Sequence, residues 1–182
     1  LNSDMVLTDE QLDRARSVMH MIREKKVTKY NLAPIKRPNV GREGVKKVLV
    51  IDQAYQDFSI PFGLASDASF EEMLAAAQRE HPDKDIIVKT HPEAFRGGRK
   101  GYFTGLKQEG NVYAYTDPIC PFSLLEVVDE VYCVTTQMGF EALLCGKKVH
   151  CFGMPFYGGW GVTEDRVACP RRTQQRSVEE IF

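Results

Sequence analysis

The stretch Lys47-Val-Leu-Val-Ile-Asp52 decides the fold class, because its aliphatic residues follow one another without a polar break. A continuous run of this kind is typical of a parallel strand that is buried on both faces. Segments with helical patterning separate it from similar runs at 85–89, 111–115, 130–134 and 148–152. This alternation predicts an α/β fold, a Rossmann-like, doubly wound parallel sheet.

The helical segments begin at residues that favour helix N-termini. Thr8 and Gln11 form a capping box, and the apolar spacing after them predicts a helix to about Lys26. The other predicted starts are Ser69, Pro121, Thr135 or Thr136, and Ser177. Residues 53–63 are expected to form a loop, and residues 154–166 a glycine-rich aromatic segment.

Prolines and glycines between residues 34 and 44 indicate a linker. Residues 1–44 are therefore predicted to form a helix and a linker, and residues 45–182 one Rossmann-like lobe. The chain begins at Leu1 and ends within a predicted helix, so we expect a fragment of a longer protein.

Composition argues against several classes of protein. Lys and Arg total 24 and Asp and Glu total 25, so the net charge of −1 does not favour a nucleic-acid partner. No apolar run reaches the roughly 18 residues of a transmembrane segment, and no apolar N-terminal segment marks secretion. The 5 cysteines lack C-x-x-C spacing, which favours buried, reduced thiols over a metal site.

Ligands of doubly wound sheets bind beyond the carboxyl ends of the strands. The polar side chains that follow the predicted strands are therefore the candidate site residues. They are Gln53 and Asp57 after the first strand, Lys89 and His91 at the second, and Thr135, Thr136 and Gln137 after the fourth. The chain has neither G-x-G-x-x-G nor G-x-x-x-x-G-K-[ST], so those two phosphate motifs give no support.

Several of these residues have two interpretations. Thr135 and Thr136 either cap a helix or, with its N-terminus, hold a phosphate. Glu141, one turn further on, would then be placed to accept hydrogen bonds from ribose hydroxyls. His91 is either a hydrogen-bonded structural histidine or a donor to a phosphate or leaving group. Lys89 either supplies positive charge there or forms the solvent end of its strand.

Carboxylates and aromatic residues also have two interpretations. Asp57 lies in a loop beyond the first strand, where a carboxylate can act as base or nucleophile. Asp52 could simply cap the turn. Tyr157 and Trp160 share the segment Tyr157-Gly-Gly-Trp-Gly161, which is either an aromatic plug over the core or a platform for a sugar or base.

Four motifs together resemble the bacterial capsule polysaccharide β-Kdo transferases of the KpsC type. Gln53-x-x-x-Asp57 followed by Ser59 is the first, and Lys89-Thr-His-Pro92 is the second. The third is Thr135-Thr-Gln-Met-Gly-Phe-Glu-Ala-Leu143. The most distinctive is Met154-Pro-Phe-Tyr-Gly-Gly-Trp-Gly-Val-Thr-Glu-Asp-Arg166. The resemblance extends from about residue 30 to the end of the chain.

The resemblance implies a retaining glycosyltransferase that takes Kdo, an eight-carbon 2-keto sugar acid, from CMP-Kdo, with no cofactor and no metal. Its members pair two Rossmann lobes in a GT-B-like arrangement. Residues 45–182 would be the CMP-binding lobe, and residues 1–44 would lead to an acceptor lobe outside this sequence.

The positions within the motifs imply roles for individual residues. Asp57 would be the nucleophile, while His91, Thr135 and Thr136 would meet the CMP phosphate and Glu141 the ribose. The resemblance also places Gln53, Lys89, Gln137, Tyr157 and Trp160 among the substrate-binding residues. Cys120-Pro121 stands where these transferases often have Asn-Pro, so contacts from that Asn side chain are not carried over.

The resemblance further implies a lysophosphatidylglycerol-linked Kdo acceptor, other capsule assembly proteins as partners, and a cytoplasmic location peripheral to the inner membrane. Two alternatives stay open: a GT-B transferase or epimerase using another nucleotide sugar, and a non-catalytic capsule export component. The basic stretch Arg96-Gly-Gly-Arg-Lys100 is either a solvated loop or a contact for acidic polymer or anionic lipid.

Overall fold

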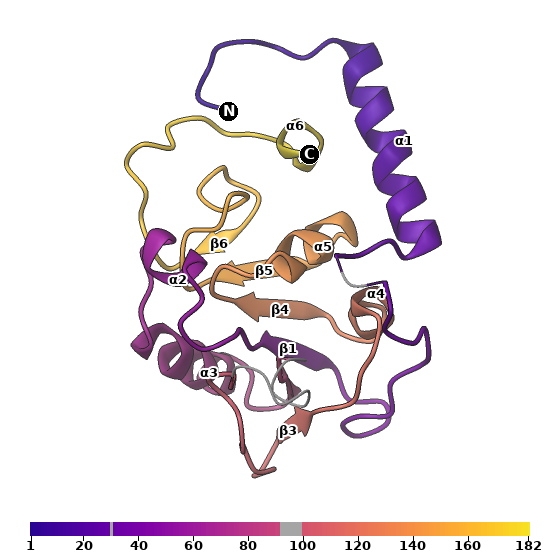
Figure 1. Cartoon of the computed structure of the whole chain (residues 1–182), viewed down its shortest axis with the longest axis vertical. Coiled ribbons are helices and arrows are strands. Elements are labelled where there is room, and N and C mark those ends of the chain that lie inside the picture. Colours follow the sequence, from indigo (N-terminus) through magenta and orange to yellow (C-terminus); the bar gives the residue numbers. More distant parts are fainter. Residues whose placement is uncertain (30, 92–99) are drawn as a thin grey trace.

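The computed structural model describes residues 1–29, 31–91 and 100–182, and Figure 1 shows how its helices and strands are arranged. The strands of this part are β1 (Lys47–Ile51), β2 (Asp85–Lys89), β3 (Val112–Tyr115), β4 (Glu130–Cys133), β5 (Lys148–Cys151) and β6 (Glu164–Asp165). The helices are α1 (Asp9–Lys25), α2 (Ser59–Phe62), α3 (Ala68–Glu80), α4 (Pro121–Leu125), α5 (Met138–Leu144) and α6 (Val178–Ile181).

The strands form one sheet in the order β3-β2-β1-β4-β5-β6. Every neighbouring pair is parallel. The chain builds outward from β1 to β3 on one side and from β4 to β6 on the other, so the order reverses between β1 and β4. The predicted α/β, Rossmann-like, doubly wound parallel sheet is confirmed.

Strand β1 shows why a continuous aliphatic run is needed here. Val48 and Val50 point into the core cluster that contains α3, whereas Leu49 and Ile51 point into the cluster that contains α4 and α5. Successive side chains of a strand face opposite sides, so a strand covered on both sides needs apolar residues throughout. All four side chains are at most 3% exposed.

Helix α1 begins with the predicted capping box, in which the Gln11 amide donates to the Thr8 hydroxyl and the Thr8 amide donates to the Gln11 side chain. Met19 is buried and Ile22 packs beside it against the cluster that contains α4 and α5. Arg23 donates to the Leu144 carbonyl at the end of α5. The segment before the linker therefore contributes to the packing of the sheet's helical layer.

Two predicted loop segments contain regular structure. Residues 59–62 form the short helix α2, which buries Ile60 and leaves Phe58 and Phe62 exposed. Residues 164–165 form β6, which pairs with the end of β5. Neither segment has enough periodic residues to reveal itself in the sequence, because one is a single helical turn and the other a two-residue edge strand.

Two predicted helix caps are wrong. Helix α3 begins at Ala68, and the Ser69 hydroxyl instead accepts from the Ser66 amide in the turn before it. Helix α5 begins at Met138 after Gln137, later than Thr135 or Thr136 would place it. The Thr136 hydroxyl accepts weakly from the Met138 amide at 3.4 Å, and the Thr135 hydroxyl is used elsewhere.

No helix among the described residues is both long enough and apolar enough to span a lipid bilayer. Pro92 of the second motif and residues 96–99 of the basic stretch lie outside the described part of the chain, so their predicted roles stay predictions.

Candidate functional site

The reversal of strand order places β1 and β4 side by side at the centre of the sheet. In folds of this class, the loops that leave two such strands diverge toward opposite faces and open a crevice at their carboxyl ends. Here β1 leads to α2 and α3 on one face, and β4 leads to α5 on the other. Figure 1 shows α2 beyond the arrowheads of β4 and β5.

Gln53, Ser59 and Thr135 form a hydrogen-bonded bridge between the two loops. The Gln53 side-chain oxygen accepts from the Thr135 amide at 2.8 Å, and its nitrogen donates to the Thr135 hydroxyl at 2.9 Å. The Ser59 hydroxyl lies 2.9 Å from the Thr135 hydroxyl and 3.3 Å from the Gln53 nitrogen. Residues 82 positions apart in the sequence are thus fixed next to each other where a ligand would bind.

Glycines allow this close approach of the two loops. A Cβ at Gly63, at the end of α2, would overlap the Thr135 methyl group, and a Cβ at Gly153 would lie 2.9 Å from it. The Met154 amide also donates to the Gly63 carbonyl at 2.6 Å, which ties α2 to the segment after β5. Any larger residue at either glycine would push the loops apart.

Asp57 lies in the loop between β1 and α2 and is half-buried. One carboxylate oxygen accepts from the Ser59 amide at 2.8 Å, while the other has no hydrogen-bond donor among the described residues. The residue before it, Gln56, has φ +61°, a left-handed conformation that is unusual for a residue other than glycine. The loop thus holds the Asp57 carboxylate by one oxygen and leaves the other available.

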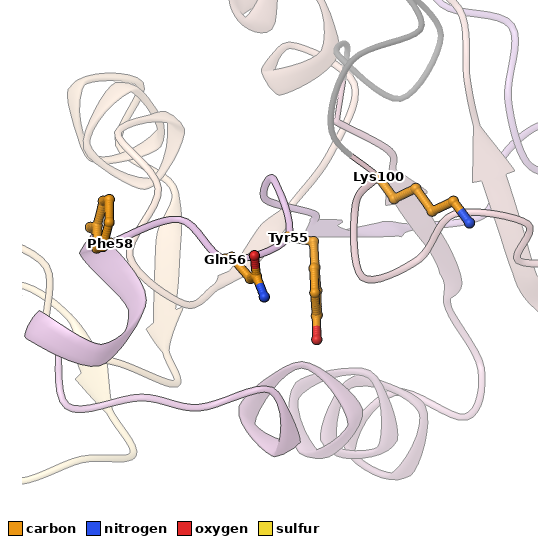
Figure 2. Close-up of a pocket in the computed structure, with 4 residues that line it drawn as sticks. All are labelled: Tyr55, Gln56, Phe58 and Lys100. Atoms are coloured by element: carbon orange, nitrogen blue, oxygen red, sulfur yellow. The ribbon is translucent and has the colours of Figure 1, made fainter.

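Two open hollows adjoin this loop. Asp57 lines one of about 630 Å³, together with Tyr102 and residues of α2 and the turn before α3. Tyr55, Gln56, Phe58 and Lys100 line the other, of about 440 Å³. Figure 2 shows that the Tyr55 and Phe58 side chains diverge from the loop, and that the Lys100 chain extends away from Phe58.

Asp52 has a structural role, in agreement with its predicted function as a cap of the turn. Its carboxylate accepts from the backbone amides of Gln53 at 2.9 Å and Tyr102 at 2.8 Å, and more weakly from His91 and Phe103 at 3.4 Å. Burial raises its pKa, and these amides partly offset that effect. Asp52 therefore fixes the loop that carries Tyr102 against the end of β1.

Lys89 and His91 lie at the carboxyl end of β2, next to β1. The His91 amide reaches the Asp52 carboxylate, which anchors the backbone of the His-Pro motif at the same edge of the sheet. The Lys89 ammonium donates to the Thr90 carbonyl at 3.1 Å and lies 5.6 Å from the Tyr115 ring centre. Burial lowers the pKa of Lys89 to about 8.

The segment before α5 contributes both exposed and buried groups. Gln137 is exposed, Thr136 is half-buried, and Glu141 on the first turn of α5 is only 6% exposed. Burial raises the pKa of Glu141 to about 7, against a hydrogen bond from the Lys29 backbone that lowers it. The structure therefore places Glu141 between α5 and the segment after α1 rather than in open solvent.

Tyr157 and Trp160 are buried, with exposed fractions of 0% and 6%. The Tyr157 hydroxyl donates to the Thr136 carbonyl at 2.6 Å, and the Trp160 ring nitrogen donates to the Phe156 carbonyl at 2.9 Å. Arg172 covers the Trp160 ring at 5.1 Å. This geometry favours the aromatic plug, in which Tyr157 supports the Thr136 backbone from beneath, over direct contact of these rings with a sugar.

A second polar cluster lies where the end of α3 meets β4 and β5. His81, Glu130 and His150 offer potential metal ligands within 4.8 Å of one another. The Glu130 carboxylate already accepts from Lys84 at 2.5 Å and from His150 at 3.0 Å, and Arg166 approaches His150 at 3.4 Å. Lys84 and Arg166 supply positive charge next to the three potential ligands, which already have hydrogen-bond partners. The cluster is therefore a charge-balanced polar network rather than a cation site.

Sequence reasoning did not find two contributors to the site. Ser59 belongs to the first motif, but no role was predicted for it, and its hydroxyl is part of the bridge to Thr135. Tyr102 lines the hollow beside Asp57, and its hydroxyl donates to Asp67 at 2.9 Å. Tyr102 follows the glycine-rich segment 97–101, so no periodic pattern marks its position, and only the contact of that loop with Asp52 brings it to the site.

Comparison with known proteins identifies the family of this chain. The family described as "Capsule polysaccharide biosynthesis protein" matches residues 3–182. "Capsule polysaccharide modification protein LipA" of Neisseria meningitidis serogroup A is 45% identical over an alignment of 182 residues, and the match covers 97% of this chain and 26% of that protein. "Lipopolysaccharide-processing protein LpsZ" of Rhizobium meliloti is 39% identical over an alignment of 176 residues, and the match covers 94% of this chain and 39% of that protein.

Two solved structures are also similar. The β-Kdo 2,4 transferase of Thermosulfurimonas dismutans KpsC superposes with a TM-score of 0.93 and 41% identity, over 100% of this chain and 56% of that chain. The β-Kdo 2,7 transferase of the same protein gives a TM-score of 0.69 and 28% identity, over 96% and 53%. This chain spans between a quarter and a little over half of these relatives. It belongs to the capsule polysaccharide biosynthesis protein family.

Proposed function

We propose that this chain is the nucleotide-sugar-binding part of a retaining β-Kdo transferase that acts in capsule polysaccharide biosynthesis and takes Kdo from CMP-Kdo. The observation that carries the proposal is the bridge of Gln53, Ser59 and Thr135 across the β1–β4 crevice, with the Asp57 carboxylate presented beside it. The similarity to two KpsC Kdo transferases also supports the proposal that a Kdo donor binds in this crevice.

Asp57 is the proposed nucleophile. Departure of CMP leaves positive charge at the anomeric carbon of Kdo, and a carboxylate on the opposite face can trap that centre. Attack by the acceptor then restores the original configuration. The Ser59 amide holds one oxygen of Asp57, so the carboxylate is oriented before the donor binds, and its second oxygen is available for bond formation.

His91 and the segment before α5 would stabilise the departing CMP phosphate. The phosphate gains negative charge as the glycosidic bond breaks, and fixed donors aimed at it lower the barrier. The Thr136 hydroxyl, the Gln137 side chain and the His91 ring are the donors assigned to this task. Glu141 is assigned to the ribose, for which its buried carboxyl must become reachable when the nucleotide binds.

Tyr157 and Trp160 support the site from within, as their burial requires. The domain division is part of the proposal: residues 45–182 bind the donor, and residues 1–44 connect toward an acceptor lobe. The reaction needs no cofactor and no metal in this scheme, because the His91 ring and the Thr136 and Gln137 side chains are assigned to the phosphate charge.

The higher similarity to the 2,4 transferase favours a β-Kdo 2,4 linkage over a 2,7 linkage. The acceptor in the proposal is Kdo-bearing lysophosphatidylglycerol, which would bring the protein to the cytoplasmic side of the inner membrane beside other capsule assembly proteins. A comparison of products made on acceptors with free 4-OH or free 7-OH groups tests the linkage directly.

Donor recognition is tested by calorimetric titration of the chain with CMP, UDP and GDP. Binding of CMP alone is the expected result. Preference for UDP or GDP would replace the proposal with a transferase or epimerase of another nucleotide sugar. No binding of any nucleotide, by the chain or by a chain extended to the length of the solved relative, would favour a non-catalytic component.

The residue roles are tested by three variants. Asp57→Asn keeps the shape of the loop, so we expect CMP affinity to persist while Kdo transfer by the extended chain is lost. His91→Ala should weaken both. Asp83→Asn, in an exposed turn at the other end of the sheet, is the matched control and should change neither. Loss of CMP binding in Asp57→Asn together with normal binding in His91→Ala would contradict the assignment.

A further inference from the structure

We propose that the Lys89 ammonium binds the carboxylate of the acidic donor sugar and thereby selects a sugar acid over a neutral sugar. This inference rests on the proposed function and deepens it, because the proposed function leaves the partner of Lys89 open. It is argued from the position of Lys89, from the contacts of its ammonium group and from the charges around it.

Lys89 is the last residue of β2, at the edge of the sheet where the proposed donor binds. It pairs with Ile51 of β1 on one side and with Tyr115 of β3 on the other. Its carbonyl accepts from the Asp52 amide at 3.0 Å, and His91 follows two residues later. The lysine is thus part of the same rim that carries the His-Pro motif.

The ammonium group is poorly satisfied within the described part of the chain. An ammonium has three donors. One of them reaches the Thr90 carbonyl at 3.1 Å, and the Tyr115 ring lies 5.6 Å away. Lys89 forms no ion pair with a described residue, although it is half-buried. Such a group is costly to bury unless an anion pairs with it.

The carboxylates nearest to Lys89 are already committed to other partners. Asp52 accepts from four backbone amides, and Asp117 pairs with Lys36 at 3.3 Å. Both attract Lys89 only over a longer range, and burial still lowers the pKa of Lys89 to about 8. A ligand carboxylate at the ammonium would supply the missing partner and return the pKa toward its usual range.

The chemistry of a 2-keto sugar acid calls for such a cation. Its carboxylate is bonded to the anomeric carbon, which is the atom that Asp57 would attack. Two carboxylates brought together at one carbon repel each other, and a fixed positive charge offsets that repulsion. The phosphate already has His91 and the donors before α5 in the proposed scheme. Lys89, at the end of β2, is a described cation of this rim to which that scheme assigns no other role.

The test compares CMP-Kdo with CMP, which shares the nucleotide but lacks the sugar carboxylate. Affinities for both are measured by calorimetry for the chain, for Lys89→Met and for the exposed-lysine control Lys107→Met. We expect Lys89→Met to keep CMP affinity within about twofold and to lose roughly 10- to 100-fold in CMP-Kdo affinity, the usual effect of one charge-assisted hydrogen bond. Lys107→Met should match the unmodified chain.

A thermal melt separates a binding role from a structural one. Replacing a partly buried ammonium that has no ion-pair partner among the described residues with an apolar side chain should leave the melting temperature of Lys89→Met unchanged or higher. Equal loss of CMP and CMP-Kdo affinity, no loss of either, or a lower melting temperature would overturn the inference. Failure of both the unmodified chain and the extended chain to bind CMP would instead refute the proposed function.

Discussion

Replacing Glu141 with glutamine tests whether the chain keeps a carboxyl group at an energetic cost. The side chain is 6% exposed, and burial raises its pKa to about 7 from an ordinary 4.5. Glutamine has the same shape, and its oxygen can still accept from the Lys29 backbone. The substitution therefore removes the titration of this carboxyl group and little else.

The sign of the effect follows from proton binding. Between pH 4.5 and about 7, the unfolded chain has released the Glu141 proton while the folded chain still holds it. The free energy of unfolding therefore falls as the pH rises through this range, by about 1.4 kcal/mol per pH unit. The accumulated cost at pH 8 is about 3 kcal/mol, and Glu141→Gln should regain most of it.

Urea unfolding of both proteins at several pH values between 4.5 and 8.5 measures this difference. Glu141→Gln should match the unmodified chain near pH 4.5 and exceed it increasingly up to about pH 7. The exposed carboxyl variant Glu71→Gln, on α3, is the control and should show no such trend. A stability difference for Glu141→Gln that is independent of pH would refute the reasoning.

Two further predictions concern the bridge and the second polar cluster. Gln53→Met removes the partners of the Thr135 amide and hydroxyl, so it should cost about 2–4 kcal/mol in urea unfolding, whereas Gln78→Met on the exposed side of α3 should stay within about 0.5 kcal/mol. An equal cost for both would contradict the bridge. Burial opposes ionisation of Glu130, but hydrogen bonds from Lys84 and His150 lower its pKa to about 2. Burial also lowers the pKa values of His81 and His150 below 6.5. As the pH falls, these three side chains take up protons in the unfolded chain before they do so in the folded chain. The free energy of unfolding should therefore fall from pH 6.5 toward pH 2. Glu130→Gln should flatten the pH dependence of the free energy of unfolding below pH 4.5. An unchanged slope in that range would rule out this network as the cause of the acid destabilisation.

The strands were predictable because burial on both faces requires an uninterrupted aliphatic run. The Lys47–Ile51 strand and the Asp85–Lys89 strand lie where the sequence placed them. The capping boxes at Thr8 and Ser177 were also predictable, because a cap depends on residues only three positions apart. The cap expected at Ser69 failed, since its hydroxyl had a competing acceptor role in the preceding turn.

The site residues also fall into those that the sequence predicted and those that it did not. Asp57 and His91 lie beyond the ends of their strands, as motif position predicted. The sequence did not reveal the contacts of Asp52, Thr135 and Trp160, because each depends on a partner far along the chain. Asp52 fixes the Tyr102 loop, Thr135 joins Gln53, and Trp160 packs under Arg172.

By itself, the sequence determined the number of the main strands and their order along the chain, the edge of the sheet where the candidate site lies, and the residue types available there. Those features depend on local patterning and on the rule that parallel strands present their carboxyl ends together. Only the tertiary structure decided which side chains face that crevice and which instead form the hydrogen bonds that stabilise it. The Gln53–Thr135 hydrogen bonds and the half-buried position of the Lys89 ammonium exist only once β2, β1 and β4 lie side by side, because each depends on neighbours that chain order does not supply.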